Sequence, residues 1–451
     1  MNAPRTDLEQ LAQQVAGWAR PGEEVEAYLA RGSGTEARTY EGEVESLSSE
    51  AYAGAGIRVV AGHRQGFAYA GSLAPDVLAE TLEEARDNAS FASPEDWVGL
   101  PRPDGVAPAP LELWREELAG FTTAAKVAAA LDLEKAVRSA DRRIRQVESA
   151  TWGDSSSEMA LASSVGTSAA DRSTACYLSV TAVAGDAAAS QVAHGYTVGR
   201  APSELDPAKA VNDAVTRAVR MLGATKPRSA HLPVVLEPRV SAQLLGLLGQ
   251  VLSGEMVLKG ISLFAGHLGE AVAAPAFTLV DDPTEPAAWG ASAFDAEGLA
   301  CRRNVLIEDG VLRAFLYDTT SARRAGTQPT ASAVRASYKG APGVGARAIC
   351  LTPGPMSQPE VLAHIGDGLL VQSVTGVHSG VNPVSGDFSV GAEGLLVQGG
   401  QLGAPVKEMT IASTIQRMLQ GVVAVGADLE WLPAPAAGMT IAISEMSMSG
   451  S

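Results

Sequence analysis

Residues 376–394, GVHSGVNPVSGDFSVGAEG, form the most distinctive stretch of this chain. Glycine recurs through it between polar residues, and apolar strand-like runs flank it on both sides. A glycine-rich backbone can reach positive φ and approach another backbone closely. Polar side chains on such a loop are typical of a surface that contacts a peptide or a small ligand. The candidate binding residues are therefore the polar residues of the loop: His378, Asn382, Ser385, Asp387 and Ser389.

The composition outside the loop indicates a globular protein with more than one core. A chain of 451 residues exceeds the size of a single domain, and 46% apolar with 19% charged residues is typical of ordered proteins. A formal net charge of −17 argues against binding to nucleic acid or to an anionic membrane surface. No apolar run approaches the ~18 residues of a membrane-spanning helix.

The N-terminal segment and the cysteines favour a cytoplasmic protein. Residues 1–20, MNAPRTDLEQLAQQVAGWAR, have the pattern of a capped amphipathic helix and lack that of a signal peptide. Cys176, Cys301 and Cys350 are few and scattered, which fits a reducing compartment without a disulfide framework. We expect each cysteine to be a small core residue.

Two units of helix, strands and helix are predicted in the first half of the chain. The predicted elements are a helix at about 6–19, strand-like runs over 23–32 and 37–53, a hairpin over 56–71 that turns at 61–64, a helix near 74–90, a proline-marked linker at 101–110, a helix near 122–138, strands between 144 and 200, and a helix near 206–222. This recurrence suggests a duplication, although no matching residues accompany it.

The best domain boundary is Thr225–Arg228, which contains Pro227, and the chain beyond it is rich in strands and glycine. Asp309-Gly310 lies between two apolar runs and predicts a type I′ hairpin, and Gly399-Gly400 repeats that pattern. The sequence thus predicts an α+β fold. Its parts are an N-terminal α+β domain at 1–225 and a β-rich, largely antiparallel domain at 226–451.

Three segments together resemble the TldD/PmbA family of metalloproteases. They are GIRVVAGHRQGFAYAGSL (56–73), LPVVLEPRVSAQLLGLL (232–248) and the closing run from Gly376 to Thr414. The matches follow one another over nearly the whole chain. The resemblance implies an α+β N-terminal domain followed by a β-rich C-terminal domain, in a dimer that encloses a cavity.

The chain departs from the family pattern where the TldD branch carries HExxxH on a helix. Two histidines of that motif ligate zinc and the glutamate activates water. The equivalent stretch here, 243–260, contains no histidine, and the nearest pair of histidines, His364 and His378, lies 14 residues apart. This resembles the other branch, PmbA or TldE. We therefore expect no catalytic residue and no metal on this chain, with zinc on a TldD-type partner.

Other residues are weaker candidates for catalysis or for ligand binding. His267 and Glu270 form H-x-x-E without a third ligand, and Glu255 is interpreted as a surface or capping residue. His378 and Asp387 could support acid–base chemistry, but a loop held by its own hydrogen bonds is the favoured interpretation. Serines 379, 385 and 389 lack a G-x-S-x-G elbow, and GAPGVGAR (340–347) lacks the lysine of a phosphate-binding loop.

The preferred hypothesis is a pseudo-catalytic PmbA/TldE-type subunit of a cytoplasmic TldD–TldE metalloprotease. The resemblance implies hydrolysis of unfolded or extended peptides in a shared cavity, and exposed strand edges could bind such peptides by backbone pairing. One alternative is a non-enzymatic homodimeric peptide-binding or modulator protein. A third hypothesis is a self-sufficient hydrolase that uses His378 and Asp387.

Overall fold

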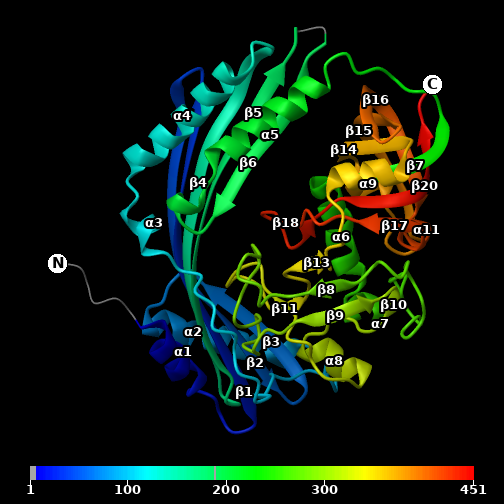
Figure 1. The fold of residues 1–451 in the computed structure, drawn as a ribbon. Helices are drawn as coiled ribbons and strands as arrows, with labels where there is room; N and C mark the ends of the chain where they lie inside the picture. The colour runs from blue at the N-terminus through cyan, green and yellow to red at the C-terminus, as the bar shows by residue number, and fades with distance from the viewer. Residues whose placement is uncertain (1–6, 187–188) are drawn as a thin grey trace.

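The computed structural model describes residues 7–186 and 189–451, which form two parts lying side by side (Figure 1). The first part is one six-stranded sheet with its helices. Its elements are α1 (Leu8–Ala16), β1 (Glu23–Tyr40), β2 (Glu43–Ala61), β3 (Arg64–Ala70), α2 (Pro75–Phe91), α3 (Glu116–Gly120), α4 (Thr123–Ala140), β4 (Ile144–Ser163), β5 (Ser168–Ala184), β6 (Gln191–Gly199), a 3₁₀ turn η1 (Pro202–Glu204) and α5 (Pro207–Arg220).

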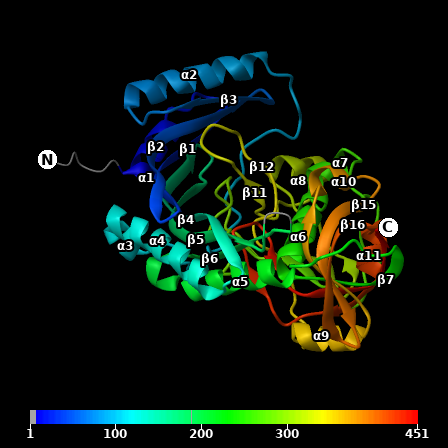
Figure 2. The same ribbon diagram turned by 90° about the horizontal axis from the view of Figure 1, so that it is seen from above.

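The strand order β3-β2-β1-β4-β5-β6 gives the two predicted units a symmetrical arrangement. Each unit contributes three consecutive antiparallel strands, and β1 pairs with β4 at the centre of the sheet. This seam runs from Glu26 opposite Ser163 to Thr39 opposite Ala150. In the second unit, α4 and α5 lie side by side on the sheet (Figure 2). Their alanine, leucine and valine side chains bury Trp152 of β4.

A glycine in the last strand of each unit lets the following helix approach the sheet closely. A Cβ on Gly66 of β3 would lie 2.0 Å from the carbonyl oxygen of Ala85 in α2. A Cβ on Gly195 of β6 would lie 1.8 Å from the carbonyl oxygen of Ala210 in α5. The two units therefore use the same packing device at corresponding positions.

Local turns explain most of the predicted strand boundaries, and they also explain one strand boundary that the sequence pattern missed. The hairpin predicted to turn at 61–64 is confirmed, because Ala61 pairs with Arg64. The pattern over 37–53 predicts one strand-like run, which is wrong. β1 ends at Tyr40, and the chain reverses through Glu41 and Gly42, both at positive φ, before β2 begins. Glu-Gly is a weaker turn signal than Asn-Gly or Asp-Gly because glutamate seldom adopts positive φ.

The second part is built on a mainly antiparallel sheet that curls back on itself. Its strand order is β16-β15-β14-β7-β20-β17, and β16 also pairs with β20. The elements are β7 (Ala230–Leu236), α6 (Pro238–Val251), α7 (Gly254–Leu258), β8 (Leu279–Asp281), β9 (Asn304–Glu308), β10 (Val311–Leu312), α8 (Thr319–Ala325), β11 (Ala333–Val334), β12 (Gly343–Val344), β13 (Ile349–Leu351), α9 (Gln358–Ile365), β14 (Gly368–Thr375), α10 (Val377–Gly380), β15 (Asp387–Gln398), β16 (Gln401–Thr414), α11 (Ile415–Gln420), β17 (Val422–Val425), β18 (Glu430–Trp431), β19 (Ala437–Gly438) and β20 (Ile441–Ser449).

This architecture confirms the predicted α+β fold with a β-rich, largely antiparallel C-terminal region. Both predicted tight hairpins are present: Asp309-Gly310 joins β9 to β10, and Gly399-Gly400 joins β15 to β16, with all four residues at positive φ. Among the described residues, no helix is long and apolar enough to cross a membrane. That residues 1–225 and 226–451 fold as independent units stays a prediction.

Candidate functional site

A cleft of about 380 Å³ runs along α6, which contains the first residues of the histidine-free stretch 243–260. One face of α6 is fixed in the core, because Leu244, Leu245 and Leu248 are buried against the curled sheet. The other face carries Gly246 and Gly249, and a Cβ on Gly249 would lie 2.9 Å from that of Ala346. These small residues leave room for a cleft within the size range of ligand pockets.

The chemistry of the cleft lining suits binding better than catalysis. The lining residues are Gly246, Gly249, Gln250, Ser253, Met256, Val344, Gly345, Ala346 and Pro435. Their polar side chains are one amide and one hydroxyl, and the Ser253 hydroxyl accepts a hydrogen bond from the Met256 N–H at 3.3 Å. Zinc takes thiolate, imidazole and carboxylate ligands, so this lining does not fit a zinc ion.

A buried carboxylate supports the wall opposite α6. Asp281 at the end of β8 is fully buried, and its Oδ1 accepts hydrogen bonds from the backbone N–H groups of Arg347 (3.0 Å) and Ala348 (2.7 Å). Oδ2 of the same carboxylate is buried and has no hydrogen-bond partner in the described structure. Burial raises the pKa of Asp281 to about 6. The segment that lines the cleft thus depends on a group that titrates near neutrality.

We expect Asp281→Asn to change how stability depends on pH. The folded pKa, about 6, exceeds the ordinary value of 3.8, so the folded chain takes up this proton at a higher pH than the unfolded chain. Wild-type stability relative to the variant should therefore fall by about 2 kcal/mol as the pH rises from 4 to 7. Chemical denaturation of both proteins at the two pH values measures this difference. The exposed Asp132→Asn is the control for loss of one carboxylate, and a pH-independent difference for Asp281→Asn would contradict the expectation.

The structure places the five polar residues on an exposed surface that runs from α10 through the following turn into β15. Asn382 closes the turn, since its Oδ1 accepts hydrogen bonds from the N–H groups of Val384 (2.9 Å) and Ser385 (3.2 Å). The Ser385 hydroxyl donates to Oδ2 of Asp387 at 2.6 Å. His378 lies on α10 and Ser389 on β15, both exposed. The loop's own side chains therefore hold its shape, as the favoured interpretation anticipated.

The loop residues form one surface but do not enter the α6 cleft. None of the five is among the residues that line it. Between His378 and Asp387 the described structure contains no hydrogen bond or ion pair, and Asp387 pairs with Ser385 instead. His267 and Glu270 contact each other at 2.7 Å on the surface, and Glu255 pairs with Lys259. Within the described residues, no three His, Cys, Asp or Glu side chains are grouped to hold a metal ion.

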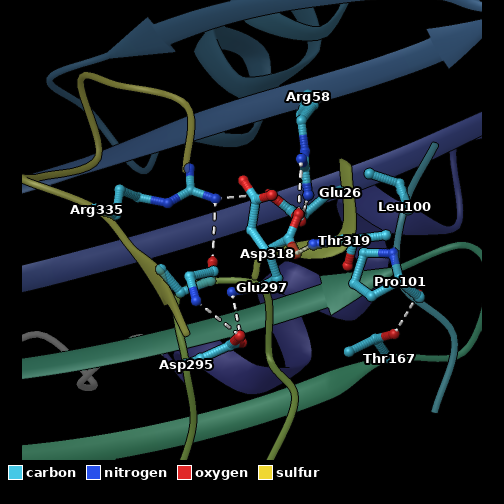
Figure 3. A network of polar contacts seen from close by, with 12 residues as sticks. Glu26, Arg58, Leu100, Pro101, Thr167, Asp295, Glu297, Asp318, Thr319 and Arg335 are labelled. Carbon is cyan, nitrogen blue, oxygen red and sulfur yellow. Dashed lines mark hydrogen bonds and ion pairs between the residues drawn. The ribbon is translucent and has the colours of Figure 1, made fainter. Parts of the chain in front are cut away.

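Sequence reasoning did not detect a buried network of charges that joins the two parts of the chain (Figure 3). Arg58 of β2 donates to Glu26 of β1 at 2.5 Å and to Glu297 at 3.1 Å. Arg335 donates to the other oxygen of Glu26 at 2.7 Å. Glu297 also accepts a hydrogen bond from the Thr319 N–H at the start of α8 at 2.9 Å. These four charged side chains are at most 2% exposed.

The network perturbs pKa values, yet it is not a catalytic site. Burial alone would raise the pKa of Glu26, but Arg58 and Arg335 lower it below its ordinary value. Burial and the neighbouring Glu297 raise the pKa of Asp295 to about 7, while both Asp295 oxygens accept backbone N–H donors. Perturbed carboxylates often mark active sites, but a reacting group must reach its substrate. Because these side chains are buried, a substrate cannot reach them. We therefore interpret the network as a structural joint, a contact that holds the two parts of the chain together.

Comparison with known proteins places the whole architecture in one family. Three parts of the chain match the PmbA/TldA metallopeptidase family: domain 1 at 25–89, the central domain at 116–222 and the C-terminal domain at 229–450. The chain therefore belongs to the PmbA/TldD metallopeptidase family, as the sequence resemblance indicated.

Named relatives come from both branches of this family. The chain is 28% identical over 408 residues to metalloprotease PmbA of Escherichia coli O157:H7, which covers 90% of this chain and 88% of that protein. It is 27% identical over 386 residues to a TldD homologue of Haemophilus influenzae, covering 82% and 78%. The solved structure of TldE from Thermococcus kodakarensis superposes with a TM-score of 0.88 at 25% identity, covering 95% and 97%.

Proposed function

We propose that this chain is the PmbA/TldE-type subunit of a TldD–TldE metalloprotease, with zinc supplied by a TldD-type partner. The observation that carries the proposal is the lining of the α6 cleft. Where the TldD branch has HExxxH, this chain presents Gly246, Gln250 and Ser253 beside aliphatic groups. Such a lining can hold an extended peptide, whereas it offers no group to activate water.

In the proposed complex this chain shapes the cavity and contacts flexible peptide substrates. Folded proteins would be too large to enter, so the substrates are unfolded or extended segments in the cytoplasm. The exposed polar loop, with His378, Asn382, Ser385, Asp387 and Ser389, is the proposed contact for peptide or partner. Its fixed shape favours this role, because a preorganised loop loses little entropy on binding.

Reconstitution with a zinc-bearing partner tests the proposal. The purified chain, a TldD-type subunit and their mixture are incubated with an unstructured peptide, and the metal content of each protein is measured. We expect less than about 0.1 zinc per isolated chain and peptide cleavage that needs the partner and stops with a chelator. Near-stoichiometric zinc on this chain would overturn the proposal. Chelator-resistant cleavage by the chain alone would support the hydrolase hypothesis with His378 and Asp387.

Replacement of Gly386 by valine is expected to reduce the activity of the complex more than it reduces stability. Gly386 lies at φ +82, which a β-branched residue resists, and an added Cβ would lie 2.1 Å from Oε1 of Gln416. Gln416 donates to the Ser385 carbonyl at 3.2 Å, so the loop would lose a tether as well. The strain should cost about 1–3 kcal/mol. Thermal melting and peptidase assays of the same complex compare the two effects, with the exposed Val384→Ala as control.

A further inference from the structure

Half of β2 is a sheet edge without a partner strand. Along its whole length β2 pairs with β1, but on its other side β3 pairs only with residues 55–61. No strand of the described residues pairs with 43–54 on that side. Every residue from Glu43 to Tyr52 is exposed, which means that neither face of this half-strand is covered. About ten residues of free edge span roughly 33 Å.

The free edge is held in place at both ends. At the end next to the turn between β1 and β2, the N–H of Gly42 donates to the buried carboxylate of Glu134 in α4 at 2.9 Å. At the other end, where pairing with β3 begins, the ring of Tyr52 stacks on Tyr338 from the C-terminal part, with 6.4 Å between ring centroids. A strand fixed in this way already has the conformation that a pairing peptide requires.

The charged side chains of the edge favour a binding partner of opposite charge. Glu41, Glu43, Glu45 and Glu50 are the charged residues of 41–52. Arg38 of β1 forms an ion pair with Glu45, so the negative charge of the edge comes from the other three glutamates. Ser46, Ser48 and Ala51 between them are small enough to let another backbone approach. Two copies paired through this edge would bring together six carboxylates that have no ion pair in the described structure, which opposes a second copy as the occupant.

We propose that the β2 edge over 43–52 binds an extended peptide segment rich in lysine or arginine as an added antiparallel or parallel strand. Backbone hydrogen bonds supply the affinity, while the glutamates prefer basic side chains. The inference rests on the proposed function, because it names basic extended segments as a preferred substrate class of the complex. The edge lies outside the α6 cleft, so it acts as a separate docking site for the chain that is to be cut.

Binding of short peptides to the purified chain alone tests the site. A fluorescent peptide that alternates lysine with valine is compared with its glutamate counterpart and with a lysine version N-methylated at every residue. We expect saturable binding of the lysine peptide, weakened by salt, and at least about tenfold weaker binding of both other peptides. The N-methylated peptide keeps the charge but loses the backbone donors.

A matched pair of variants locates the binding. Glu43→Lys/Glu50→Lys should weaken binding of the lysine peptide by about tenfold or more. Glu80→Lys/Glu84→Lys, the same charge change on the exposed side of α2, should change that binding by no more than about twofold. Equal binding to both variants, or of the N-methylated peptide, would overturn the proposal. So would a native dimer that dissociates only in the β2 variant, because a second copy would then occupy the edge. The assay needs no zinc-bearing partner, so its failure leaves the proposed subunit role standing.

Discussion

Arg58→Ala is expected to lower the free energy of unfolding by about 3–5 kcal/mol. The substitution removes the only cation that contacts both Glu26 and Glu297 in the described structure, and both carboxylates would stay buried. Glu297 would then carry an uncompensated charge away from water, while Glu26 would keep only its ion pair with Arg335. Because Glu26 belongs to the first part and Glu297 to the second, the two parts should also separate more easily.

Denaturant unfolding and limited proteolysis measure these two consequences. The matched control is Arg20→Ala, which breaks an ion pair with Glu83 whose side chains are 57% and 55% exposed. That change should cost no more than about 1 kcal/mol. Similar losses for the two variants would show that the buried network contributes no more than a surface pair. Faster proteolysis between the two parts in Arg58→Ala alone would identify the network as their joint.

Gly195→Val is expected to displace α5 from the sheet and to cost about 3 kcal/mol or more. The clash is with backbone atoms, namely the carbonyl oxygen of Ala210 and, at 2.8 Å from the added Cβ, the nitrogen of Ala214. A backbone cannot rotate away as a side chain can. Movement of α5 would also disturb Arg217 and Arg220, which both donate to Glu237 at the start of α6.

Circular dichroism and denaturant unfolding of Gly195→Val test this packing. Gly120→Val is the control, because an added Cβ at Gly120 meets no atom within 4 Å. Gly66→Val should behave like Gly195→Val, since Gly66 occupies the corresponding place against α2. A mild effect at Gly195 together with a severe one at Gly66 would contradict the equivalence of the two units.

The features that could be predicted from the sequence are those that depend on one short segment of the chain. Asp309-Gly310 and Gly399-Gly400 specify their hairpins through local backbone preferences, and the helices near 74–90 and 122–138 follow from their apolar period. The Glu41-Gly42 reversal was missed because its residues give a weak turn signal. The family assignment needed three ordered segments, each of which is weak alone.

The missed features depend on residues that are distant in the sequence. Arg58 interrupts the apolar run of GIRVV, which was a sign of a buried partner, but nothing near it points to Glu297 or Arg335. One wall of the α6 cleft comes from 344–346 and 435, so spacing along α6 could not predict it. The shape of the polar loop was anticipated, whereas its role in binding stays a prediction.

The seam between β1 and β4 has a consequence for how the chain assembles. Two units that meet strand to strand about a central pair have the geometry of two separate molecules joined along one edge. Here the segment over 92–122 tethers them, and it also packs against the sheet, since Leu100 and Leu113 are buried and the Thr167 hydroxyl of the second unit donates to the Pro101 carbonyl. The large sheet is in this sense an intramolecular dimer, whose recognition surface is the seam between β1 and β4.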